Sequence, residues 1–326
     1  MPDQKLLSIV VPVYNGADTI EELVYAVASQ SLRYPIEFVL VNDGSQDASH
    51  DVCMRLVCSG PVPVTLIDHA RNFGEHNAVL TGLRHVNGDY VITMDDDLQN
   101  PPSEVGNLLN KLVESDADLI YGVAIKKQHA LWRNIGSKFA NWVADWINDK
   151  PRGVYISTFR GMRRFVADAI VRYEGPYPFV DGLAYQVTNR VASVPVEHLP
   201  NRTGRSNYTI PKLVSLWTTI LVNFSAKPLH VSIYVGFTMA CLGLIGAICV
   251  IISYVIYGSD VAGWASLAVL LTTFTGAQLL ILGVIGEYVG RMFFDLSKKP
   301  QAVIRSKRTS RDPSLRGGPK PLARRS

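Results

Sequence analysis

The sequence lacks the features that would assign it to several common classes of nucleotide or metal protein. No G-x-G-x-x-G follows the first predicted strand, and no Walker-type Gly-Lys-Ser/Thr loop occurs in the 326 residues. A dinucleotide oxidoreductase and a P-loop nucleotidase are therefore disfavoured. The four cysteines have neither zinc-site spacing nor the pattern of a disulfide framework, so we expect reduced thiols. None of the seven histidines forms a recognisable metal-ligand pair with another.

Charged residues are absent from two long stretches near the C-terminus. Val231 to Tyr257 is a run of 27 uncharged residues, and Val261 to Gly286 gives 26 more. Each run exceeds the roughly 20 residues that a helix needs to cross the hydrocarbon core of a bilayer. The sequence therefore predicts a hairpin of two transmembrane helices, 231–257 and 261–286, rather than two buried helices of a soluble domain.

The flanking charges predict the orientation of this hairpin. Lys227 precedes the first run and Arg291 follows the second, whereas the connection Gly258–Asp260 carries no Lys or Arg. By the positive-inside rule, both ends and the large N-terminal region face the cytoplasm. The N-terminus has no basic segment followed by an apolar signal core, because the run Leu6–Val13 is too short and leads into a strand-turn pattern.

Basic residues are concentrated in the C-terminal tail. Residues 296–326 hold ten Lys or Arg against one Asp, which leaves a net charge of −5 for residues 1–295 because the whole chain carries +4. The composition, rich in Pro, Gly, Ser and Arg, predicts a disordered tail over 291–326. Such a tail is attracted to anionic lipid, and we expect no nucleic-acid partner.

Strand-like and helix-like segments alternate through residues 8–123. The predicted strands are 8–13, 37–41, 64–67, 90–94 and 118–123, and the predicted helices are 19–29, 47–57, 75–85 and 103–115. This alternation predicts an α/β fold, a mainly parallel sheet with helices on both faces. Ligands of such sheets bind outside the carboxyl ends of the strands. The polar segments "VYNG", "NDGSQD", "HARNFG" and "DDDLQ" follow the first four predicted strands in turn.

Three adjacent carboxylates, Asp95 to Asp97, stand at the end of the fourth predicted strand in "VITMDDDLQNPP". A divalent cation, Mg²⁺ or Mn²⁺, could neutralise them by bridging carboxylate and the pyrophosphate of a nucleotide. If the extended conformation continues through the triplet, Asp95 and Asp97 face the same side and share one ion, while Asp96 points elsewhere. The alternative is a solvated acidic turn.

Seven motifs follow one another along the chain: "SIVVPVYNGADTI", "VNDGSQD", "RNFGEHNAVLTGL" and "GDYVITMDDDLQNPP", then "GRSNYT", "NFSAKPL" and "GEYVGRMFFD". In this order they resemble glycosyltransferase family 2. Together with the hairpin they are similar to the polyisoprenyl-phosphate glycosyltransferases, which include dolichol-phosphate mannose synthase and bacterial undecaprenyl-phosphate sugar transferases. The resemblance covers residues 6 to about 300.

The resemblance implies inverting transfer of a sugar from a UDP- or GDP-sugar to a polyprenyl phosphate, undecaprenyl phosphate in bacteria, for a cell-envelope glycan or lipid modification. It implies a cytoplasmic GT-A catalytic domain over 1–209, an amphipathic juxtamembrane helix over 210–230, and a membrane region over 231–290 ahead of the tail. A bacterial inner membrane location and a homo-oligomer, a tetramer in several relatives, are implied as well.

Mapped onto the family pattern, the metal set is Asp95, Asp97 and Gln99, with Mg²⁺ or Mn²⁺ as cofactor. Asp96 fills the variable middle position and is free to face the donor's ribose or sugar, or water. The remaining nucleotide contacts are Pro12, Tyr14, Asn15, Asp43 and the loop Arg71, Asn72, Phe73 and Gly74. The family has an acidic residue where this chain has Gly16, so the contact made there is lost or replaced.

The acceptor phosphate calls for arginines, which suit its geometry. The candidates are Arg160, Arg202 and Arg205, with Ser206 and Tyr208 as hydrogen-bonding partners; surface salt bridges are the alternative for each arginine. Arg202 stands one position after the family's arginine, which is Asn201 here. The family's acceptor-side Asp is missing near Val154 and Tyr155. Asp181 therefore joins Asp97 and Arg160 in the predicted catalytic set, as base or orienting group, the alternative being an N-cap.

Two amphipathic stretches, 131–147 and 210–229, could place this chemistry at the bilayer or could be ordinary core helices. A polysaccharide synthase is a weaker alternative, because the chain lacks a Gln-x-x-Arg-Trp motif and further spans. An inactive membrane-anchored sensor or scaffold for nucleotide sugars also stays open, because the departures at Gly16 and Val154 could reflect lost activity. The sequence does not identify the sugar or the nucleotide.

Overall fold

The computed structural model of the chain describes residues 5–124, 157–175, 178–197, 199, 227–257, 263–297 and 300–310. These residues divide into two compact units, one drawn from residues 1–207 with 300–326 and the other from residues 208–299. The assignment of residues 1–209 as a catalytic domain stays a prediction. The C-terminal segment, however, belongs to the first unit and not to a separate tail.

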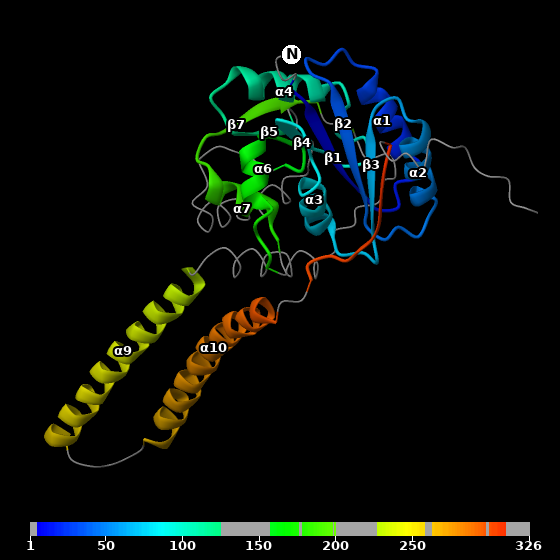
Figure 1. Cartoon of the computed structure of the whole chain (residues 1–326). Helices are drawn as coiled ribbons and strands as arrows, with labels where there is room; N and C mark the ends of the chain where they lie inside the picture. Colours follow the sequence, from blue (N-terminus) through cyan, green and yellow to red (C-terminus); the bar gives the residue numbers. More distant parts are fainter. Residues whose placement is uncertain are drawn as a thin grey trace, which may run out of the picture. The chain divides into compact units, whose positions relative to one another are not determined.

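The first unit is built on a sheet of eight described strands (Figure 1). They are β1 Leu7–Val13, β2 Ile36–Asn42, β3 Val64–His69, β4 Tyr90–Thr93, β5 Leu119–Ala124, β6 Arg160–Arg163, β7 Val191–Val196 and β8 Ile304–Thr309. The order across the sheet is β7-β5-β6-β4-β1-β2-β3-β8. β6 runs antiparallel to β4 and β5, and β8 runs antiparallel to β3, while the other pairs are parallel. The predicted mainly parallel α/β sheet is confirmed.

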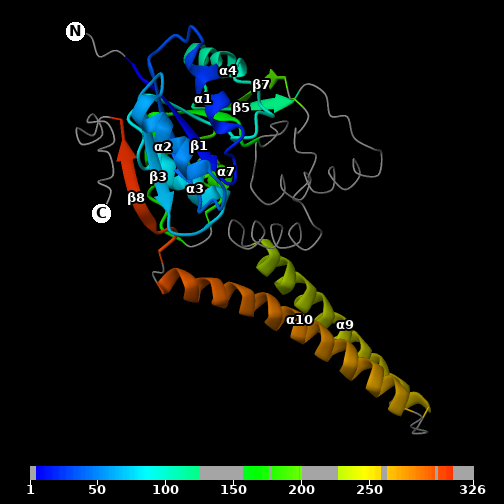
Figure 2. The same cartoon turned by 90° about the vertical axis from the view of Figure 1, so that its right-hand side faces the viewer.

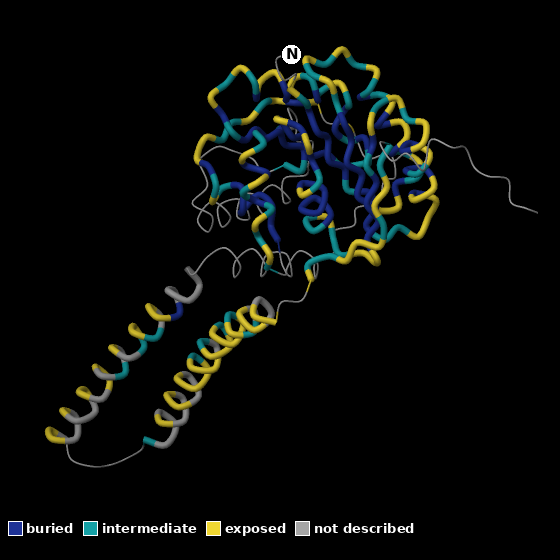
Figure 3. Tube along the Cα trace, in the orientation of Figure 1, coloured by how far each residue is buried: buried dark blue, intermediate teal, exposed yellow. Residues whose placement is uncertain are grey.

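Helices cover both faces of this sheet. They are α1 Ile20–Ala28, α2 Ser49–Ser59, α3 Glu75–Leu83, α4 Glu104–Glu114, α6 Arg164–Ile170 and α7 Val180–Val187. One hydrophobic core joins α1, α2 and α4 to alternate residues of β1, namely Leu7, Ile9, Val11 and Val13. On the other face α3 packs closely on β1, with Gly82 next to Val10, and α6 and α7 adjoin α3. Figure 2 shows the sheet from the side and Figure 3 shows its buried centre in dark blue.

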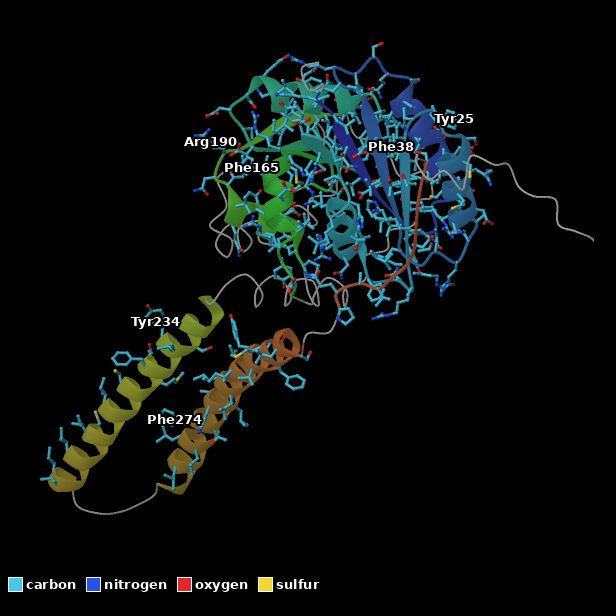
Figure 4. All side chains as sticks on the ribbon, in the orientation of Figure 1. Tyr25, Phe38, Phe165, Arg190, Tyr234 and Phe274 are labelled. Atoms are coloured by element: carbon cyan, nitrogen blue, oxygen red, sulfur yellow. The ribbon has the colours of Figure 1, made fainter. Side chains whose placement is uncertain are left out.

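The predicted secondary structure of residues 8–123 is confirmed, because every predicted strand and helix is present within two residues of its expected bounds. These strands can be predicted from local sequence because each is a largely apolar run, which is typical of strands covered by helices on both faces of the sheet. In β2, for example, every residue except Ile36 is buried. Figure 4 labels Phe38, which lies in this strand near the middle of the sheet.

The C-terminal segment differs from the prediction of a disordered tail. Ile304–Thr309 form β8 at the sheet edge, antiparallel to β3, in red beside β3 in Figures 1 and 2. Ser306 Oγ donates a hydrogen bond of 2.7 Å to Asp68 Oδ2, and Asn42 Nδ2 donates one of 2.9 Å to Asp68 Oδ1. A strand with Arg and Lys side chains also protects the edge of a sheet from pairing with other chains. Residues 311–326 lie outside the described residues.

The second unit consists of two helices, α9 Lys227–Tyr257 and α10 Trp264–Leu296. They pack on each other, since a Cβ placed on Gly243 of α9 would lie 2.9 Å from the Phe274 ring of α10. Many apolar side chains on both helices are exposed, among them Ile233, Tyr234 and Leu271, as the yellow segments of Figure 3 show. Judged on the described residues, no helix is both long and apolar enough to cross a membrane. The transmembrane hairpin stays a prediction.

Candidate active site

The polar residues predicted from the sequence gather at one edge of the sheet. The loops after β1, β2, β3 and β4 carry, in turn, Tyr14 and Asn15, then Asp43, then Arg71 to Gly74, and then Asp95 to Gln99. These four strands are parallel neighbours in the sheet, so their carboxyl ends lie side by side. Pro12 lies within β1, one residue before its end.

The loop after β1 is fixed by the loop after β2. Asn15 has a left-handed backbone with φ of 55°, a conformation that Asn tolerates better than most residues. Its N–H donates to Ser45 Oγ at 3.0 Å, and its Oδ1 accepts from the Gln46 N–H at 2.9 Å. Asn15 therefore holds two loops together. Tyr14, by contrast, keeps 48% of its surface exposed, and its predicted contact with a nucleotide stays a prediction.

Asp43 positions the loop after β3. Its Oδ1 accepts a hydrogen bond from the Phe73 N–H at 2.9 Å, and its Oδ2 accepts one from the Gly74 N–H at 2.8 Å. The Nδ1 atom of the buried His69 lies 2.7 Å from Asp43 Oδ1. The guanidinium of Arg71 stacks over the Phe73 ring at 4.3 Å. Asp43 thus orders the predicted nucleotide loop, while its own contact with a nucleotide stays a prediction.

The three carboxylates after β4 have three different surroundings. Asp95 Oδ2 accepts a hydrogen bond of 2.6 Å from Thr158 Oγ1, and Asp97 Oδ1 accepts one of 3.0 Å from the Gln99 N–H. Asp96 instead lies against Gly16 in the loop after β1. The strand ends at Thr93 and the chain bends at the triplet, so the condition that the extended conformation continues through it is not met. Loop contacts, and not strand alternation, separate the three side chains.

The chemistry of the predicted metal set fits a hard divalent cation. Asp95, Asp97 and Gln99 offer only oxygen ligands, as Mg²⁺ and Mn²⁺ prefer. Asp95 accepts a hydrogen bond from Thr158 and Asp97 accepts one from the Gln99 N–H, and an ionised carboxylate has about four lone-pair sites. No group of three or more His, Cys, Asp or Glu among the described residues could hold a metal ion. The predicted set has only two carboxylates and relies on an amide for its third ligand.

A buried ion pair adjoins these carboxylates. Arg160 opens β6 opposite Thr93 of β4; its side chain is fully buried and paired with Asp181 through Nη1. Its Nε donates to Thr93 Oγ1 at 3.0 Å, and Tyr121 OH donates to Asp181 Oδ1 at 2.9 Å. Arg160 Nη2 is buried and has no hydrogen-bond partner among the described residues. The structure thus leaves one strong donor of Arg160 for an anion.

The alternative interpretations of Arg160 as a surface salt bridge and of Asp181 as an N-cap are wrong. Arg160 does not form a surface salt bridge, because neither partner of its ion pair exceeds 5% side-chain exposure. Asp181 is not the N-cap of its helix, because α7 begins at Val180 with Phe179 at the cap position. Asp181 lies in the first turn with its side chain directed into the ion pair. Its geometry suits an orienting group, whose catalytic role stays a prediction.

The first turn of α3 adds two site residues that the sequence argument missed. Loss of surrounding water, and then the charges of Asp95, Asp181 and Asp97, raise the pKa of Glu75 to about 7 against the opposing effect of Arg160. Its side chain nevertheless remains exposed to solvent. Burial lowers the pKa of His76 to about 4, so this imidazole is neutral near pH 7. Both residues directly follow the predicted nucleotide loop "RNFG", and this position is the feature of the sequence that could have identified them.

Burial and the Asp181 charge also raise the pKa of Tyr121 well above its usual value, so its hydroxyl stays protonated and donates to Asp181. Nothing in the sequence around Tyr121 pointed to this role, because the contact joins residues 60 positions apart.

The remaining predicted residues lie outside the described part of the chain. They are the acceptor-side residues Arg202, Arg205, Ser206 and Tyr208, the positions Val154 and Tyr155, the stretch 131–147, and most of 210–229.

The sheet order, the helices on both faces and the acidic loop after β4 define an α/β domain of the GT-A type. Residues 8–171 match the family model of Glycosyl transferase family 2, and the chain belongs to this family. The resemblance inferred from the sequence motifs is confirmed.

Relatives within this family match nearly the whole chain. The undecaprenyl-phosphate 4-deoxy-4-formamido-L-arabinose transferase of Pseudomonas syringae pv. syringae (strain B728a) is 34% identical over 304 residues, covering 92% of this chain and 90% of that protein. A protein of the same name from Yersinia enterocolitica serotype O:8 / biotype 1B (strain NCTC 13174 / 8081) is 30% identical, covering 92% and 93%.

A solved structure supports the fold. Glucosyl-3-phosphoglycerate synthase from Mycobacterium tuberculosis, in complex with Mn²⁺, uridine diphosphate and glucosyl-3-phosphoglycerate, matches 67% of this chain and 78% of that chain. The TM-score is 0.50 and the identity is 16%, so the similarity concerns the fold alone.

Proposed function

We propose that the protein transfers a sugar from a nucleotide-sugar donor to a polyprenyl phosphate, undecaprenyl phosphate in particular. The observation that carries the proposal is the match to the undecaprenyl-phosphate sugar transferases over 92% of this chain. The site agrees with it chemically: an acidic loop suited to a metal-bound diphosphate lies beside a buried arginine with an unpaired donor.

On the donor side, Tyr14, Asn15 and the loop from Arg71 to Gly74 bind the nucleotide. Asp95, Asp97 and Gln99 would hold Mg²⁺ or Mn²⁺, which when bound neutralises negative charge on the departing nucleoside diphosphate. Mn²⁺ and uridine diphosphate are both present in the mycobacterial structure with the same fold. A UDP-sugar is therefore the first donor to test, with GDP-sugars next.

On the acceptor side, the phosphate supplies its own nucleophile. The second pKa of a phosphate monoester is about 6, so the attacking oxygen is already charged near pH 7 and needs no strong base. This oxygen forms a bond to the anomeric carbon as the bond from that carbon to the diphosphate breaks, with inversion. Arg160 binds the acceptor phosphate through Nη2, together with Arg202, Arg205, Ser206 and Tyr208, and Asp181 holds Arg160 in place.

The proposed acceptor is a membrane lipid, so the protein must be attached to a membrane to reach it. The first uncharged run falls within α9 and most of the second falls within α10, and these helices expose apolar side chains such as Ile233 and Leu271. We include in the proposal their insertion as a hairpin in the bacterial inner membrane, with the catalytic unit on the cytoplasmic side and the chain in a homo-oligomer.

The test is acceptor-dependent release of nucleoside diphosphate by the purified full chain in detergent. A panel of UDP- and GDP-sugars is supplied with Mg²⁺ or Mn²⁺, with and without undecaprenyl phosphate. We expect at least one donor to be cleaved only when the lipid is present, and Asp97→Ala to abolish this cleavage. Asp116→Ala, which removes an 88% exposed carboxylate, is the matched control and should keep full activity. Failure of every donor would favour a sensor or scaffold.

A further inference from the structure

A cavity of about 370 Å³ lies at the amino edge of the sheet, opposite the candidate active site. Its lining comes from the starts of β2 and β3, the segment after α3, the first residue of α6 and the second half of β8. β2 and β3 are parallel, so these starts lie at one edge, whereas the loops with Asp43 and Asp97 follow the carboxyl ends of strands at the other. The volume falls within the range of small-molecule sites, about 300–1,000 Å³. The structure therefore contains a second candidate binding site.

Positive charge predominates in this cavity. The charged side chains of its lining are Arg84, Arg164, Lys307 and Glu37. Burial lowers the pKa of the lining residue His85, and the charges of Lys307 and Arg84 act in the same direction, so this imidazole is neutral near pH 7. Three cations and one carboxylate leave a net charge of +2 on the lining. An anion is therefore the class of ligand that this cavity favours.

Two of the cations lack a counterion. Arg84 Nη2 donates hydrogen bonds of 2.7 Å to Gln301 Oε1 and of 3.1 Å to the Tyr173 carbonyl oxygen, both of which are uncharged. Neither Arg84 nor Lys307 forms an ion pair with a carboxylate in the part of the chain that the structure describes. Burial lowers the pKa of Arg84, because a guanidinium that loses water without gaining a counterion is destabilised. A bound anion would relieve this cost.

The carboxylate of the lining is satisfied by other groups. Glu37 is buried and accepts hydrogen bonds of 2.7 Å from Ser8 Oγ and of 2.7 Å from the Asn87 N–H, so it does not engage the cations. Arg164 pairs through Nε with Asp168 at 2.7 Å, at a partly exposed position. A guanidinium carries five N–H donors, so Arg164 keeps donors for a ligand.

The groups that line the cavity suit a phosphate. Guanidinium groups bind phosphate through paired N–H donors, and a phosphate monoester carries about −1.5 to −2 charges near pH 7, which matches the net charge of the lining. Thr65 Oγ1 donates to Thr309 Oγ1 at 3.4 Å, so the Thr309 hydroxyl is a further donor. A carboxylate ligand has one charge and two oxygens, and would leave part of the positive charge uncompensated.

We propose that this cavity is a second site, which binds a phosphate-bearing anion through Arg84, Arg164 and Lys307. A free diphosphate and a lipid headgroup with a terminal phosphate offer the same chemistry, and the experiment below distinguishes these two sources. Because Lys307 and Thr309 belong to β8, which lies along β3 (Figure 2), the bound anion also ties the C-terminal segment to the sheet. The proposal does not depend on the proposed function, because none of these residues belongs to the proposed site of sugar transfer.

The first arm of the experiment measures binding of inorganic pyrophosphate to the full chain in detergent, by calorimetry. EDTA is present, so that no divalent metal holds the probe in the candidate active site. We expect Arg84→Gln and Lys307→Gln each to weaken binding about tenfold, the effect of losing one charged hydrogen bond. Arg190→Gln is the matched control, because it removes a 63% exposed guanidinium elsewhere on the same unit, and it should bind as the wild type does. Lys307 is exposed, so its replacement leaves the strand pairing of β8 in place.

The second arm tests the lipid source. Thermal unfolding of the full chain is followed in detergent micelles that contain either phosphatidic acid or phosphatidylcholine, since a ligand that binds the folded state raises Tm. A rise with phosphatidic acid that Lys307→Gln loses and Arg190→Gln keeps assigns the site to a lipid headgroup; selective loss of pyrophosphate binding alone assigns it to a soluble phosphate compound. Either result supports the site. Equal responses of the Lys307→Gln and Arg190→Gln variants to both probes, or no response of the wild type to either probe, would overturn it.

Discussion

Asp181→Asn tests whether the Arg160–Asp181 pair is as deeply buried as the structure shows. The substitution keeps the shape of the side chain but leaves the Arg160 charge in a place where its exposed fraction is 0%. Removing one partner of a buried ion pair costs about 3–5 kcal/mol of unfolding free energy. For a unit of this size, about 1 kcal/mol corresponds to about 2–4 °C in Tm, so we expect Tm to fall by about 10 °C.

The assay is thermal unfolding of the full chain in detergent, followed by circular dichroism. The matched control is Asp116→Asn, which removes a carboxylate from the exposed pair with Arg190, where the atoms lie 2.8 Å apart and the side chains are 88% and 63% exposed. Figure 4 labels Arg190. A surface pair contributes about 0–1 kcal/mol, so the control should change Tm by no more than about 4 °C.

A double variant distinguishes the effect of the ion pair on thermal stability from its effect on sugar transfer. Arg160→Met with Asp181→Leu replaces both charges by apolar groups, which is often neutral or stabilising, so Tm should return close to that of the wild type while transfer activity stays lost. Equal Tm shifts for Asp181→Asn and Asp116→Asn would refute the buried pair. Full turnover by Asp181→Asn with saturating donor and metal would refute any role of Asp181 in catalysis.

Three further predictions concern other parts of the molecule. A chain ending after residue 299 lacks β8, so Tm should fall and light scattering should reveal aggregation through the bare β3 edge; unchanged behaviour would show that β8 contributes nothing. Stability should decline as pH falls from 6.5 to about 4, because the unfolded chain binds a proton there that folded His76 does not, and His76→Gln should flatten this decline in urea titrations. Asp97→Ala should abolish Mn²⁺ binding while Asp96→Ala leaves it nearly intact; equal losses would contradict the separation of the two carboxylates.

Local sequence patterns were sufficient for the N-terminal half of the fold. Buried strands such as β1 and β2 are continuous apolar runs, and parallel topology brings the polar residues that follow them to one edge. Tyr14, Asp43 and Asp97 could be assigned to a common site on that basis alone, before any three-dimensional information.

Features that depend on distant pairing could not be predicted in this way. β8 is a basic segment with the composition of a disordered tail, and only its register against β3 makes it a strand. The environment of Asp181 in α7 depends on Arg160 of β6 and Tyr121 of β5, which are distant from it in sequence. The fit of Asp96 to Gly16 joins residues 80 positions apart in sequence, and no local pattern records it.

The central claim is that a sugar is transferred to a polyprenyl phosphate. Mass spectrometry of the lipid extract, after incubation of the full chain with undecaprenyl phosphate, divalent metal and each nucleotide sugar, tests it most directly. We predict a lipid whose mass is that of undecaprenyl phosphate plus one sugar, formed with one donor and absent with Asp97→Ala. Consumption of the donor without any such lipid would contradict the account, because the sugar would then be transferred to water or to another acceptor.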